Sequence, residues 1–111
     1  MTRTFEQILK DCIELQKEKN SKYKRGEDPL SGFRLAALRS KAHSLAHYIY
    51  GRYLEKDGRI GNFYEAKKLD PYALIEELED NINYQAFQIM ALEELIPNRP
   101  HKDPFTKETV A

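Results

Sequence analysis

The chain has 111 residues, of which 41% are hydrophobic and 32% are charged, with 18 basic and 18 acidic side chains. This length fits one domain and leaves little room for a second core. The formal charge is zero, so the chain lacks the basic excess of general nucleic-acid binders. No stretch approaches the roughly 18 apolar residues of a membrane span, and the first residues lack the apolar run of a signal peptide. The single cysteine, Cys12, fits a reducing compartment, and we expect a cytoplasmic protein without a membrane partner.

The first predicted helix begins at Thr4, because Thr4 and Gln7 have the spacing of a capping box. It ends near Lys19. The apolar stripe of this helix contains the only cysteine, which we interpret as a small core residue; the stripe is Phe5, Ile8, Leu9, Cys12 and Leu15. The polar segment 20–32, "NSKYKRGEDPLSG", follows as a predicted structured loop.

The second predicted helix runs from about Phe33 to Leu54, with apolar residues close to a seven-residue repeat. Those residues are Leu35, Leu38, Ala42, Leu45, Ile49 and Tyr53. After it, Asp57-Gly58 is a strong two-residue turn signal, so we expect a small hairpin there or, alternatively, a frayed helix end.

The third predicted helix has the clearest start, because Asp70 can cap it and Pro71 can take its first position. Its apolar seam is Ile75, Leu78, Ile82, Ala86 and Ile89, and it stops near Ile96. Residues 97–111 contain three prolines and are predicted to form an extended tail. The expectation is an all-α bundle of three main helices over residues 1–96.

A second apolar edge predicts that the bundle is completed by at least a dimer. The edge is formed by Tyr48, Tyr84, Ala91 and Leu95.

Acidic side chains crowd one flank of the third helix. At 100° per residue, Glu76, Asp80 and Asn83 share that flank, and Glu77 is a neighbour of Asp80 three residues away. Carboxylates one turn apart on a rigid helix can bind Mg²⁺ together with waters and phosphate oxygens, whereas the simpler interpretation is a solvated edge. If they chelate a cation, Asp80→Asn should leave the metal-free fold as stable as before or slightly more stable, because like charges one turn apart repel each other. If an internal Lys or Arg holds Asp80, the same change should cost stability.

Three further groups have functional and structural interpretations. The basic loop, with Lys19, Lys22, Tyr23, Lys24 and Arg25, is either a phosphate clamp or a solvated charge run. Lys41 and Tyr48 share one border of the second helix and can meet a phosphate and a base, or form an ordinary helix edge. His43 and His47 have a zinc-compatible spacing, but a solvated or subunit-facing pair is the better interpretation.

Several segments together resemble a known superfamily. "EELEDNINY" resembles the E-E-x-x-D segment of the MazG-like all-α nucleoside triphosphate pyrophosphohydrolases. "DNINYQAF" is similar to the D-x-x-N-Y pattern of the phage-associated nucleotide modification domain, a relative of that superfamily. The loop "EKNSKYKRGEDPLSGFR" resembles the K-N-x-D-Y…D-P-x-x-N-F-R stretch of the same group, and "LRSKAHSL" falls where the group has D-K-x-x-R-L. The resemblance covers roughly residues 5–95.

The resemblance implies an all-α homodimer or homotetramer that handles a nucleotide, in a host cytoplasm if the chain is phage-encoded. Active members cleave a nucleoside triphosphate between its α- and β-phosphates with carboxylate-held Mg²⁺. Glu77 and Asp80 match the catalytic E-x-x-D, and Glu76 matches the preceding acid that would complete the metal ligands. Lys19, Tyr23, Lys24, Arg25, Lys41, Tyr48 and Asn83 are the predicted ligand-binding residues.

The E-x-x-E pair that active members carry on the preceding helix is absent here, because "LRSKAHSLAHYIY" contains no acid. Lys22, Ser40 and Ser44 stand where the phage group has Asp, Asp and Arg, and Glu14 and Glu18 are the available spatial substitutes. With half of the metal ligands missing, two-metal hydrolysis is hard to support. A nucleotide-sequestering protein without chemistry, or a structural or protein-binding bundle, is the alternative function.

Overall fold

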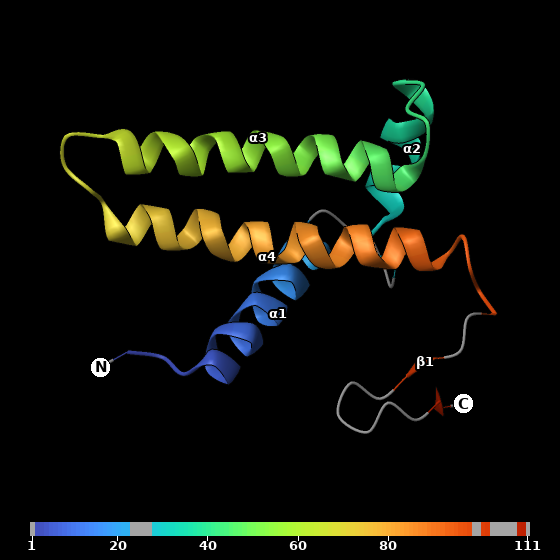
Figure 1. Cartoon of the computed structure of the whole chain (residues 1–111), viewed down its shortest axis with the longest axis horizontal. Helices are drawn as coiled ribbons and strands as arrows, with labels where there is room; N and C mark the ends of the chain where they lie inside the picture. Colours follow the sequence, from blue (N-terminus) through green and yellow to red (C-terminus); the bar gives the residue numbers. More distant parts are fainter. Residues whose placement is uncertain (1, 23–27, 99–100, 103–108, 111) are drawn as a thin grey trace.

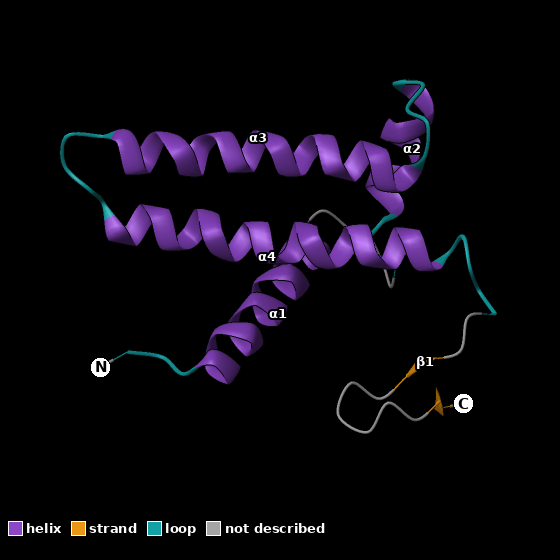
Figure 2. Cartoon of the chain, viewed as in Figure 1, coloured by secondary structure: helices purple, strands orange, loops and turns teal. Residues whose placement is uncertain are grey.

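The computed structural model describes residues 2–22, 28–98, 101–102 and 109–110. The described part is predominantly helical, which confirms the predicted all-α class (Figures 1 and 2). Its elements are α1 (Phe5–Lys22), α2 (Ser31–Arg39), α3 (Leu45–Glu65), α4 (Pro71–Glu93), and the two-residue strands β1 (His101–Lys102) and β2 (Thr109–Val110). None of the helices in the described residues is long and apolar enough to cross a membrane.

The frame of the fold is the antiparallel pair of α3 and α4, which lie side by side along most of their length (Figure 1). As predicted, Asp70 caps α4 by accepting a hydrogen bond from the Ala73 N–H at 3.2 Å, and Pro71 takes the first turn. The α1 helix crosses α4 obliquely (Figure 1). The predicted capping box of α1 is confirmed, because the Gln7 N–H donates to Thr4 Oγ1 at 3.2 Å and the Thr4 N–H donates to Gln7 Oε1 at 2.9 Å.

The single helix predicted over 33–54 is wrong, because the chain breaks between α2 and α3. Lys41 adopts a left-handed backbone with φ of 56°, and Ser44 caps α3 by accepting a hydrogen bond from the His47 N–H at 3.0 Å. The break lets α2 fold back so that Phe33 packs against rings of α3 and α4. The residues at the break include no Gly or Pro, so tertiary packing, and not local helix propensity, ends the helix there.

The hairpin predicted at Asp57-Gly58 is also wrong, because both residues lie inside α3, which continues to Glu65. A helical glycine costs only about 1 kcal/mol. That cost is offset by an apolar stripe that continues on both sides of the glycine, with Ile49 fully buried before it and Ile60 buried after it. The stripe is Ile49, Tyr53, Lys56, Ile60 and Phe63, all buried or half-buried.

The core is concentrated where α2 meets one end of the α3–α4 pair. Its buried members are Leu30, Phe33, Ala46, Ile49, Phe87 and Ala91, with Leu45, Tyr48 and Tyr84 packed against them. Cys12 is a buried residue on α1, as predicted. Tyr48, Tyr84 and Ala91 were expected at an exposed edge; instead they are buried or half-buried, and only Leu95 of that set is exposed.

The predicted seam of the third helix faces solvent instead of the core. Its members Ile75, Leu78, Ile82 and Ile89 have 36% to 58% of their surface exposed. The face of α4 that α3 covers is a different one, through Leu74, Tyr84, Phe87 and Ala91. On α1, the predicted stripe is likewise half solvent-facing, with Phe5 79% exposed.

The tail predicted to be extended lies mostly outside the described residues. Its described part includes β1 and β2, which pair antiparallel with His101 opposite Val110 and Lys102 opposite Thr109.

Candidate functional site

The acid at the centre of the predicted site, Asp80, lies between two lysines from other helices. The Lys56 ammonium on α3 donates to Asp80 Oδ2 at 2.9 Å, and the Lys19 ammonium on α1 pairs with Asp80 Oδ1. The side chains of Asp80 and Lys56 are only 15% and 16% exposed. One carboxylate of α4 thus ties together three helices, which fits the case of an acid held by internal cations.

The pKa of Asp80 reflects two opposing effects. Burial of the carboxyl group raises its pKa, but the hydrogen bonds from Lys19 and Lys56 outweigh burial and hold the pKa below its usual value. Nearby positive charge and donated hydrogen bonds favour the ionised carboxylate. Asp80 is therefore ionised at neutral pH and contributes an anion to the lysine pair.

Glu76 and Glu77, the other predicted metal ligands, occupy different surroundings. Glu76 is exposed. Glu77 is half-buried, with Oε2 3.8 Å from the Lys56 ammonium, and this oxygen has no hydrogen-bond partner in the described part of the chain. All three acids line one hollow of about 390 Å³ together with Leu15, Lys19 and Glu79.

This arrangement does not fit a magnesium ion without rearrangement. Both Asp80 oxygens already pair with ammonium groups. Mg²⁺ takes carboxylate oxygens as ligands, so the two lysines would have to move away before it bound.

A second hollow, beside the same carboxylate, combines cationic and aromatic groups. It has a volume of about 250 Å³ and lies among α1, α2, α3 and α4. Three rings form its apolar wall, and three basic side chains lie at its polar side. The lining residues are Gln16, Lys19, Phe33, Arg52, Lys56, Asp80, Asn83, Tyr84 and Phe87.

The polar wall of this pocket is anchored by specific hydrogen bonds. Asn83 Nδ2 donates to the Cys12 carbonyl at 3.0 Å, which supplies the partner that a core-side asparagine needs. Arg52 is 43% exposed and pairs with Glu55 at 2.8 Å, one turn further along α3. Because a surface pair of this kind is weak, the Arg52 guanidinium can exchange Glu55 for an anionic ligand at little cost.

The structure brings some of the predicted ligand-binding residues together and separates others. Lys19 and Asn83 line the cationic pocket with Asp80. Tyr48 lines a different hollow with Leu35 and Ser40, and the exposed Lys41 sits at the helix break, so the predicted Lys41–Tyr48 helix border does not exist. Tyr23, Lys24 and Arg25 lie outside the described residues.

The sequence interpretation missed Arg52, Lys56, Phe33 and Tyr84 as pocket residues. A signal for Lys56 exists in the sequence, because it interrupts an otherwise apolar stripe on α3. A lysine at such a position is expected to meet a buried acid.

The two histidines remain a surface pair, with ring centroids 5.3 Å apart and both side chains exposed. His43 precedes α3 and His47 lies in its first turn. Their exposure is compatible with either a solvated or a subunit-facing pair, the two predicted alternatives.

Lowering the pH should lower the free energy of unfolding, because Asp80 becomes protonated. Because the folded-state pKa lies below the unfolded value of 3.8, the ionised carboxylate contributes stability above that value. The contribution is lost as the pH falls through the folded pKa. The measurement is the free energy of urea unfolding from about pH 7 to pH 3, for the wild type and for Asp80→Asn. The difference in free energy of unfolding between the wild type and the variant should become smaller below about pH 4. A difference that stays constant with pH would contradict the pairing of ionised Asp80 with the lysines.

Comparisons of this chain with protein-family models, curated proteins and solved structures find no match.

Proposed function

We propose that the chain binds a nucleotide, or a nucleotide-like phosphate compound, in the pocket beside Asp80, without chemistry on it. The proposal rests on one observation: basic and aromatic side chains line the same pocket. The basic residues are Lys19, Arg52 and Lys56, and the aromatic ones include Phe33 and Tyr84. Lysine and arginine recognise phosphate oxygens, and aromatic faces stack on bases. The roughly 250 Å³ volume fits a base or a phosphate group, with the rest of the ligand at the opening.

The charges favour binding over hydrolysis. Lys56 lies close to both Glu77 and Asp80, so the acids that match the catalytic pattern already have counter-ions from the chain itself. A bound phosphate would compete with these acids for the lysines, and Arg52 is the basic group most easily turned to it. We therefore favour nucleotide sequestration over nucleotide hydrolysis.

The experiment is a thermal-shift screen of nucleotides, each with and without Mg²⁺. A ligand at 100 times its dissociation constant adds about 2.7 kcal/mol, which corresponds to a shift of roughly 10 °C for a chain of this size. Arg52→Gln should weaken binding about tenfold or more, because a charge-assisted hydrogen bond is lost. The matched control is Arg59→Gln, which removes an exposed arginine of the same helix outside the pocket. If no nucleotide shifts the melting temperature, or both variants behave alike, the proposal is wrong.

Magnesium-dependent cleavage is the second candidate, supported by the hollow that gathers Glu76, Glu77 and Asp80. It requires the lysines to leave Asp80, so ligand binding should then depend on Mg²⁺. Pyrophosphate release at about 1 s⁻¹ or faster would establish it over sequestration.

A further inference from the structure

The exposed face of α4 carries a regular apolar seam that the rest of the chain does not cover. Residues spaced alternately by three and four run along it, which is the heptad spacing of a helix that packs on another helix. All but one are large and apolar, and their exposed fractions lie between 36% and 58%. The apolar members are Ile75, Leu78, Ile82, Ile89, Leu92 and Ile96, the last one just beyond the helix end. The exception is Gln85, also exposed.

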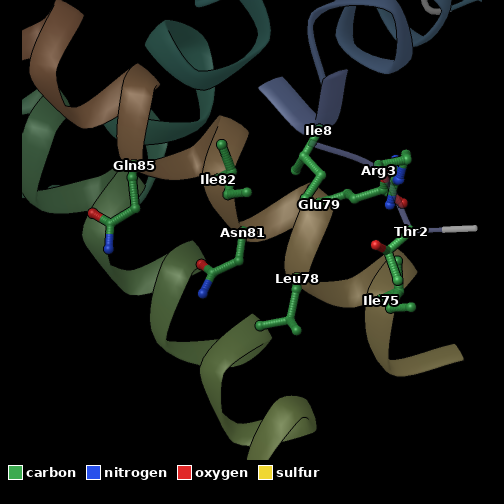
Figure 3. Close-up of a pocket in the computed structure, with 9 residues that line it drawn as sticks. All are labelled: Thr2, Arg3, Ile8, Ile75, Leu78, Glu79, Asn81, Ile82 and Gln85. Carbon is green, nitrogen blue, oxygen red and sulfur yellow. The ribbon is translucent and has the colours of Figure 1, made fainter. Parts of the chain in front are cut away.

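Part of this seam forms one wall of an open groove of about 750 Å³ (Figure 3). Ile75, Leu78 and Ile82 line it from α4, and Ile8 lines it from α1. No charged residue belongs to the seam itself, and the nearby Glu79 pairs at 2.9 Å with Arg3, which also pairs with Asp11. A second apolar surface can therefore pack on the seam without burying a charged seam residue.

The order of residues along the seam identifies the occupant. Three apolar residues lie on each side of Gln85, which stands almost midway between Ile75 and Ile96. With a rise of about 1.5 Å per residue, reversing the helix about this point puts Ile82 level with Ile89, and Gln85 level with itself. A seam that matches its own reverse is the pattern of an isologous two-fold contact.

We propose that two copies of the chain pair through α4, antiparallel, with Gln85 next to the two-fold axis. A single polar residue in such a seam fixes the register, because any slip would bury the amide against apolar side chains. The pairing does not use the pocket beside Asp80, so its failure would not affect the proposed nucleotide binding. It assigns the dimer to the seam instead of the edge at Tyr48 and Tyr84, which is internal.

The first test is the mass of the full chain in solution by sedimentation equilibrium at about 50 µM. The wild type should have the mass of a dimer, and Ile82→Asp should have the mass of a monomer with its helical circular dichroism kept. Leu38→Asp is the control, because Leu38 is an exposed leucine on α2, outside the seam. A monomeric wild type, or dissociation by Leu38→Asp but not by Ile82→Asp, would overturn the proposal. A larger assembly that Ile82→Asp leaves intact would overturn it as well.

The second test is cross-linking of the full chain under oxidation. Two helices at an axial distance of 8–10 Å bring facing Cα atoms roughly 4–5 Å apart, within reach of a disulfide. Gln85→Cys should therefore link to its own copy. Leu92→Cys should not link to itself, but should link when mixed with Leu78→Cys. Self-linking of Leu92→Cys would show a parallel pairing and contradict the two-fold arrangement. The native Cys12 is buried and serves as the background.

Discussion

Replacing Asp80 by asparagine is expected to lower the free energy of unfolding by about 2–3 kcal/mol, because two lysines lose their common anion. Lys56 is 16% exposed and cannot turn fully to solvent, whereas Lys19, at 42% exposed, can. The expected loss is therefore below the roughly 3–5 kcal/mol typical of a fully buried pair. Urea unfolding followed by circular dichroism measures the change.

The matched control is Glu76→Gln, which removes an exposed acid one turn earlier on α4 and should change stability by less than about 0.5 kcal/mol. Adding Lys56→Met to Asp80→Asn should recover part of the loss, because the unpaired buried cation is then gone. If Asp80→Asn is neutral or stabilising, the carboxylate is a like-charge or metal site and the lysine pairing is wrong.

The starts of α1 and α4 were predictable because neighbouring side chains cap them. Thr4 with Gln7, and Asp70 with Pro71, satisfy backbone groups within one turn, so no distant residue is needed to define them. The break near Lys41 was not predictable in this way. Its cause is the packing of Phe33 against rings as far along the chain as Phe87, and local helix propensity carries no information about that contact.

The buried face of α4 was predicted wrongly, and the error has a physical cause. Periodicity identifies the strip with the most apolar surface, which is the strip through Ile75 and Ile82. The strip that α3 covers contains Glu77 and Asn81 among smaller and aromatic residues, so it is less apolar. Burial depends on which neighbour is present, and hydrophobicity alone does not distinguish a neighbour in the same chain from one in another.

The candidate site was half predictable. The acids of α4 stand out because they share one helix, and helical spacing alone brings them together. Lys19 is 61 residues from Asp80 and Lys56 is 24, so their convergence follows only from the way α1 and α3 pack on α4. The charge of the site, and with it the choice between binding an anion and holding a cation, therefore depends on tertiary structure.

Replacing Phe33 by alanine is expected to have the largest effect of any single change at the pocket, about 3–5 kcal/mol. Phe33 is buried in the core, and its ring lies 5.6 Å from that of Phe87 and 5.8 Å from that of Tyr84. Deleting it removes the apolar contacts that hold α2 against the α3–α4 pair. Since small domains are stable by only about 5–15 kcal/mol, the variant should be partly unfolded at 37 °C.

Two companion variants separate packing from ligand contact. Leu38→Ala, on the exposed side of the same helix, should change stability by less than about 0.5 kcal/mol. Phe33→Leu keeps most of the apolar volume and should cost only about 1–1.5 kcal/mol, yet it removes the ring available to a base. Circular dichroism melting measures the stabilities, and the nucleotide thermal shift measures binding. A Phe33→Leu variant that stays folded but loses the nucleotide shift would place the ring against the ligand. Retention of the full shift would restrict Phe33 to the core.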